Sequence, residues 1–176
     1  DGAFAPSTVN KEDAEFANAY VVSAAYEGKF SGVTVGADVA YGNRKPSQAT
    51  GFDKRAEQYS FGADVGFSGF TIGAGYTFVD HNTHGLKNDR ALELGVAYEN
   101  GPYAVSANYF VSKDGKAGGV KMGKFQKYEV AGKYKLGAGV DAFATFAYLD
   151  LNDMAAVAYP DVDKVWTVVT GLALNF

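Results

Sequence analysis

The sequence contains few residues whose types and spacing could perform catalysis or bind a metal. His81 and His84 lie in the polar segment DHNTHG, but a metal site needs a third ligand and none is fixed nearby. The acidic segment LDLND (149–153) lacks the ligand spacing and central glycine of a calcium-binding loop. We identify no Ser-His-Asp set, no carboxylate pair for acid–base catalysis and no phosphate-binding glycine loop. We therefore predict no catalytic site, metal or cofactor, and interpret both histidines as surface-loop residues.

A second group of ionisable residues alternates with apolar side chains. Lys127, Glu129 and Lys133 share one side of a predicted strand, opposite its apolar side. The same alternation places further carboxylates on the equivalent side of other strands: Asp38, Asp64, Glu93 and Asp141. Charges spaced in this way line a surface instead of converging on one atom, and they attract or repel passing ions. The alternative is that they only solvate that surface or pair across strands.

The elements that must carry these charges are β-strands that recur along the chain. Predicted strands begin near Tyr20, Tyr59, Leu92, Tyr128 and Trp166, at intervals of 39, 33, 36 and 38 residues. Tight glycine-rich turns alternate with long polar connections. The turns are expected at 27–32, 67–69, 99–102 and 135–139, and the connections at 42–57, 80–89, 112–124 and 151–163. Four hairpins and the final strand, 166–176, make nine antiparallel strands.

The two sides of each predicted strand differ in chemistry. One side is aliphatic or aromatic, with tyrosines near the strand ends, and the other consists mostly of Gly, Ala, Ser and Thr. A soluble barrel such as a lipocalin would carry many charged residues on its outer face, which is not the case here. Tyrosine at strand ends suits the two membrane interfaces. We therefore predict an all-β, antiparallel transmembrane β-barrel, with a soluble barrel or sandwich as the weaker alternative.

Composition limits the remaining classes of function. The 176 residues are enough for one domain, and the net charge of −4 argues against nucleic-acid binding. There is no cysteine, which excludes a disulfide framework. No apolar run approaches the roughly 20 residues of a membrane-spanning helix. In the eighth strand, Phe143 and Leu149 fall on the side of small residues, which departs from the alternation.

Two sets of residues resemble the carboxy-terminal part of a Gram-negative general porin. The hairpin YEGKFSGVTVGADVAYG (26–42) is similar to later hairpins at 63–78 and 97–110. The terminus GLALNF matches the Gly-x-x-apolar-x-Phe ending of such barrels. The resemblance implies that Gly171, Leu174 and Phe176 form the signal read by the barrel-insertion machinery of the outer membrane.

The resemblance also implies a function and an assembly. Such proteins are not enzymes; they allow small hydrophilic solutes and ions to diffuse passively. They usually form homotrimers of barrels with about sixteen strands in the lipid of the bacterial outer membrane. In such a barrel, the seven charged residues on the side of small residues are candidates for the lining of the pore. Nine strands are fewer, so we expect one porin-type domain over 1–176 that belongs to a larger barrel, with 1–15 as an external loop. The alternative is a small outer-membrane barrel that acts as an anchor, an adhesin or a membrane-embedded enzyme.

Overall fold

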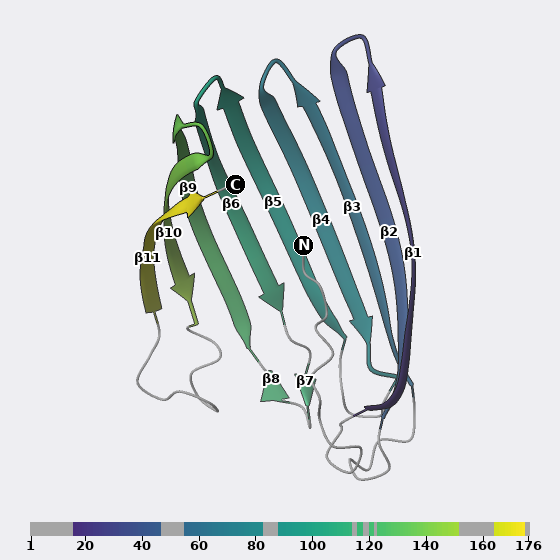
Figure 1. The fold of residues 1–176 in the computed structure, drawn as a ribbon. Coiled ribbons are helices and arrows are strands. Elements are labelled where there is room, and N and C mark those ends of the chain that lie inside the picture. The colour runs from purple at the N-terminus through teal and green to yellow at the C-terminus, as the bar shows by residue number, and fades with distance from the viewer. Residues whose placement is uncertain are drawn as a thin grey trace.

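The chain folds into one antiparallel sheet of nine strands in a computed structural model. The structure describes residues 16–46, 55–82, 88–113, 116–117, 120–121, 123–151 and 164–174. Neighbours in the sheet follow the chain in the order β1-β2-β3-β4-β5-β6-β9-β10-β11 (Figure 1). The strands are β1 (Phe16–Phe30), β2 (Val33–Pro46), β3 (Ala56–Phe67), β4 (Phe70–Asp80), β5 (Asp89–Asn100), β6 (Tyr103–Lys113), β9 (Lys124–Gly137), β10 (Val140–Asp150) and β11 (Lys164–Leu174). The nine predicted strands are therefore confirmed.

Each of the first two tight turns contains a glycine with a positive φ angle. Ser31 and Gly32 join β1 to β2 with φ values of 49° and 86°, and Ser68 and Gly69 join β3 to β4 with 48° and 82°. Positive φ at both central residues is the type I′ geometry that matches the twist of a two-residue hairpin. The turn predicted at 27–32 is therefore wider than the observed one, because residues 27–30 pair with 33–36.

The opposite end of the sheet carries the long connections. All tight turns lie at the upper end of Figure 1, and the connection between β6 and β9 lies at the lower end. That connection includes a short hairpin, β7 (Lys116–Ala117) and β8 (Val120–Lys121), which the sequence did not predict. β2 also extends to Pro46 and β3 begins at Ala56, so their connection is shorter than the predicted 42–57.

The sheet is a single layer without a hydrophobic core. Among the described residues, only Ala56, Gly66, Ala147 and Asn43 are buried. We call the side that carries the large apolar residues the apolar face and the opposite side the polar face. All but three of the exposed large hydrophobic residues lie on the apolar face, the exceptions being Val21, Phe143 and Val169. In the described part of the chain there is no helix long and apolar enough to cross a membrane.

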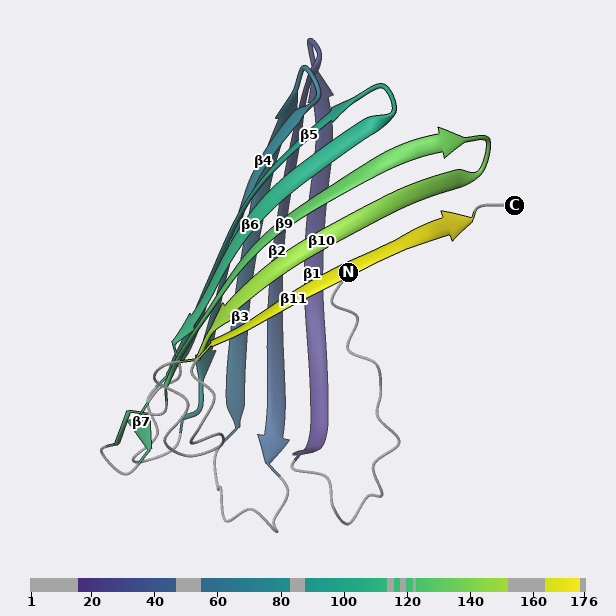
Figure 2. The same ribbon diagram turned by 90° about the vertical axis from the view of Figure 1, so that its left-hand side faces the viewer.

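The sheet has two open edges. β1 and β11 stand at the ends of the strand order, and each pairs with one neighbour only among the described strands. Because every neighbouring pair is antiparallel, the first and the ninth strand run in the same direction. Figure 2 shows the strand direction turning progressively from the upright β1 to the strongly inclined β11. This twisted sheet is the curved wall on which the charged residues lie.

Candidate functional site

Aspartates and glycines alternate reciprocally across β2 and β3 on the polar face. Asp38 lies directly opposite Gly62, and Gly36 lies directly opposite Asp64. A Cβ atom at either glycine would overlap the carboxylate of the aspartate opposite it. Each carboxylate therefore leans over the glycine of the neighbouring strand, against the wall. Glycine is used here because it leaves space for a polar side chain on the adjacent strand.

A glycine on the neighbouring strand also explains why the large ring of Phe143 can lie on the polar face. Phe143 pairs with Gly171 across β10 and β11, and its Cζ atom is 2.7 Å from the point that a Cβ of Gly171 would occupy. The ring thus lies over the one residue type that leaves room for it. The sequence analysis correctly placed Phe143 on the side of small residues. The register between β10 and β11 explains this position, because it puts Gly171 next to the ring. Gly171, predicted as part of an insertion signal, also has this packing role.

Three of the predicted pore-lining carboxylates form an acidic wall. Asp38, Asp64 and Glu93 line a hollow of about 380 Å³ together with Asn108 and glycines of β3, β4 and β5. Among the described residues these three carboxylates form no ion pair. Glu27 joins Asp38 and Asp64 around a neighbouring hollow. The sequence analysis missed Glu27, although the alternation of β1 already places it on the polar face.

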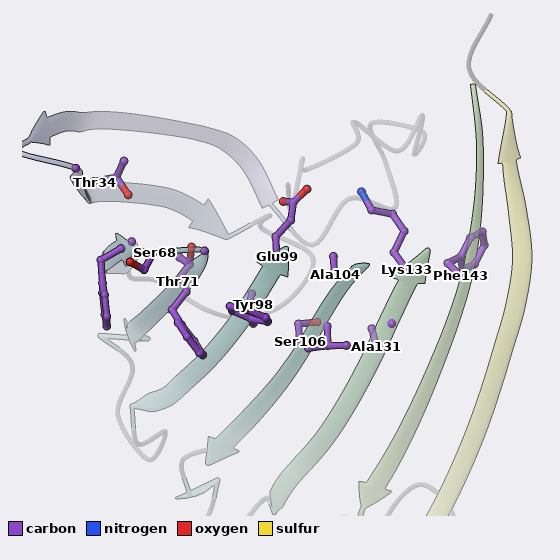
Figure 3. A pocket seen from close by; sticks show the side chains of 18 of the residues that line it. Thr34, Ser68, Thr71, Tyr98, Glu99, Ala104, Ser106, Ala131, Lys133 and Phe143 are labelled. Atoms are coloured by element: carbon purple, nitrogen blue, oxygen red, sulfur yellow. The ribbon is translucent and has the colours of Figure 1, made fainter. Parts of the chain in front are cut away.

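The charges of Lys127, Glu129 and Lys133 on β9 only partly give a basic surface. Lys127 and Glu129 form an ion pair, with their Nζ and Oε2 atoms 3.2 Å apart, so their charges compensate each other. Lys133 remains without an ion pair among the described residues and lines a hollow of about 480 Å³ near the tight turns. Ser106, Lys133 and Phe143, from three different strands, border this hollow (Figure 3).

The sequence analysis missed three further charged residues near the tight turns. Lys29 also lines the 480 Å³ hollow, and Lys135 forms an ion pair with Glu99, with Nζ and Oε1 3.5 Å apart. Asp141, a predicted pore-lining residue, lies opposite Lys135 in the register of β9 and β10. The side-chain alternation of these strands would have identified Lys29, Glu99 and Lys135.

The remaining predicted residues do not form a reactive group. Leu174 is exposed on the apolar face, whereas Phe176 lies outside the described residues. His81 contacts Asp89, with Nε2 and Oδ2 2.7 Å apart, and His84 is also outside the described residues. In the described part of the chain, no three His, Cys, Asp or Glu residues gather in a way that could hold a metal ion. The charges line a wall, which suits guiding ions along a surface.

Comparison with known proteins agrees with this arrangement. Residues 2–154 match the family model described as Gram-negative porin. No curated protein sequence matches the chain. The fold is similar to the crystal structure of Pseudomonas aeruginosa OccK9 (OpdG), with a TM-score of 0.66 and 16% sequence identity. The match covers 88% of this chain and 46% of OccK9, so the chain spans about half the length of that protein.

Proposed function

The chain belongs to the Gram-negative porin family, and we propose that it forms part of a channel through which small hydrophilic solutes and ions diffuse passively across the bacterial outer membrane. The observation that carries this proposal is the opposite chemistry of the two faces of one unlayered sheet. Large apolar side chains such as Phe61, Val130 and Trp166 are about half exposed or more on one face. Lipid is the environment that such a face requires, and a water-filled lumen suits the other.

Barrel closure is the second part of the proposal. Unpaired backbone groups in lipid cost several kcal/mol each, so β1 and β11 both need partner strands. Pairing them with each other would require a parallel contact, since both run in the same direction. We therefore propose that the described sheet is the carboxy-terminal part of a larger barrel, as one porin-type domain over residues 1–176. We also propose that the complete protein is a homotrimer and that the barrel-insertion machinery reads the final strand.

The polar face supplies the proposed pore-lining residues. Asp38, Asp64 and Glu93 form a wall of carboxylates without compensating cations among the described residues. Charges that line a narrow aqueous path select ions by attraction and repulsion. We assign Lys127, Glu129, Lys133 and Asp141 to the same lining, with Lys127 and Glu129 acting as a neutral pair. We propose no catalytic role for any of them.

The direct test is single-channel recording. The complete porin, purified and reconstituted in a planar bilayer, should produce stepwise increases in current as individual channels insert. The water-lined polar face is the reason, because it offers ions a path with no apolar barrier. Heat-unfolded protein in the same detergent is the control and should give no steps. A folded preparation that never conducts would overturn the channel assignment.

A further inference from the structure

A large aromatic ring lies on the polar face near the end of the sheet that carries the tight turns. Phe143 of β10 stands between two register partners, Lys133 of β9 and Gly171 of β11. Gly171 leaves room for the ring, and the residue is 37% exposed. A single exposed phenylalanine is common on protein surfaces, so the groups around the ring decide what it can bind.

Polar groups of two kinds surround the ring. Lys133 is exposed, borders the same hollow of about 480 Å³ and forms no ion pair among the described residues. Ser106 and Thr145 also line the hollow, two strands apart in one row of the register, with Ala131 between them. Figure 3 shows Lys133 and Phe143 next to each other on neighbouring strands. We call Phe143, Lys133, Ser106 and Thr145 the lumen site.

The charges around the lumen site offset one another. On the polar face of β5 to β11 near the tight turns, the described cations are Lys133 and Lys135, and the described carboxylates are Glu99 and Asp141. Lys135 forms the ion pair with Glu99 and is directly opposite Asp141. Asp141 is also the diagonal neighbour of Lys133, about 7–8 Å away between Cα atoms. Two positive and two negative charges give this end of the wall no net charge.

We propose that the lumen site binds the pyranose ring of a neutral sugar as it passes through the channel. The face of an aromatic ring is the negative part of its quadrupole, so it attracts the C–H groups on one side of a sugar ring. Sugar hydroxyls both donate and accept hydrogen bonds, which matches the ammonium of Lys133 and the hydroxyls of Ser106 and Thr145. The volume of the hollow lies within the range of small-molecule sites, roughly 300–1,000 Å³. This inference rests on the proposed function, because the polar face must line the lumen.

Two other classes of solute match the lumen site less well. An aromatic carboxylate needs a surplus of positive charge, but Glu99 and Asp141 offset the two lysines. An open-chain polyol has the hydroxyls of a sugar but no rigid face of C–H groups to lie on the ring, and it loses more conformational freedom on binding. A pyranose ring combines a preorganised apolar face with hydroxyls at its edge. Neutral cyclic sugars are therefore the class that fits the site.

Saturation-transfer NMR on the complete porin in detergent micelles tests the proposal, with methyl α-D-glucopyranoside as the probe. Phe143→Leu keeps the apolar bulk but removes the aromatic face, so the Kd of the glucoside should rise roughly threefold to tenfold. Lys133→Gln removes a charged hydrogen-bond donor and should raise the Kd roughly threefold. Phe110→Leu is the matched control, because Phe110 lies on the polar face of β6 near the long connections, opposite Glu93 and Lys127. The Kd of this control should equal that of the wild type.

Several outcomes would overturn the proposal. These are unchanged binding in Phe143→Leu, an equal loss in Phe110→Leu, or wild-type binding of benzoate or mannitol that is as tight as binding of the glucoside. If Phe143→Leu fails to fold, Lys133→Gln changes only an exposed side chain and decides the matter, since unchanged binding in that variant also contradicts the site. Single-channel recording separates the two proposals. A wild type that conducts without binding the glucoside would refute the lumen site alone, whereas a wild type that never conducts would refute the channel and with it this role of the site.

Discussion

Replacing Val130 with arginine should destabilise the membrane-inserted barrel, whereas arginine at the adjacent Ala131 should be tolerated. Val130 is 57% exposed on the apolar face near the middle of β9, where its neighbour in the membrane is lipid. Arginine facing lipid at the bilayer midplane costs about 2–4 kcal/mol. Unfolding by urea of the complete porin in lipid vesicles should show a loss of this size for Val130→Arg.

The adjacent position is the matched control because it differs only in the face that it occupies. Ala131 borders the hollow near the tight turns on the polar face, where an arginine side chain stays in water. Ala131→Arg should therefore insert normally and narrow the channel, which lowers its single-channel conductance. Equal destabilisation by both substitutions, or greater destabilisation by Ala131→Arg, would contradict the assignment of the two faces.

Neutralising the acidic wall should shift the ion preference of the channel away from cations. The variant Asp38→Asn/Asp64→Asn/Glu93→Gln removes three carboxylates that have no ion-pair partner among the described residues. The substitutions keep the shape of each side chain, so the register with Gly36 and Gly62 is preserved. We expect the permeability ratio of K⁺ to Cl⁻ to fall roughly twofold or more. The reversal potential in a KCl gradient measures this ratio.

Glu57→Gln is the control for this measurement. Glu57 lies on the apolar face near the long connections, where it accepts hydrogen bonds from Tyr41 and Tyr59. Its neutralisation changes the net charge without changing the proposed lumen, so the permeability ratio should stay as in the wild type. If Glu57→Gln shifts the ratio as much as the triple variant does, the acidic wall does not set the preference.

Side-chain alternation was sufficient to predict the strands and their faces. The period of two in β4, with Ile72 and Ala74 on one side and Thr71 and Gly73 on the other, is a local property that needs no knowledge of neighbouring strands. The turn boundaries were less accurate, because pairing extends as close to the turn as the backbone allows. In the first hairpin that limit is set by Ser31 and Gly32.

The register between strands could not be read from the sequence. Which glycine lies opposite which bulky side chain depends on the alignment of two distant segments, as for Phe143 and Gly171. The same limitation hid the ion pair between Lys135 and Glu99, which are 36 residues apart. Lys127 and Glu129 were placed on the correct face, but the ion pair between their side chains required the structure.

Accessibility of single cysteines along β6 tests the central claim most directly. The chain has no cysteine, so each introduced thiol reports on one position. In membranes that contain the complete porin, with any other cysteine replaced, a charged, membrane-impermeant thiol reagent should modify Ser106→Cys and Asn108→Cys and reduce their conductance. Val105→Cys and Ala107→Cys should remain unmodified. Equal labelling of all four positions, or labelling of Val105→Cys and Ala107→Cys alone, would contradict a water-lined polar face and a lipid-facing apolar face.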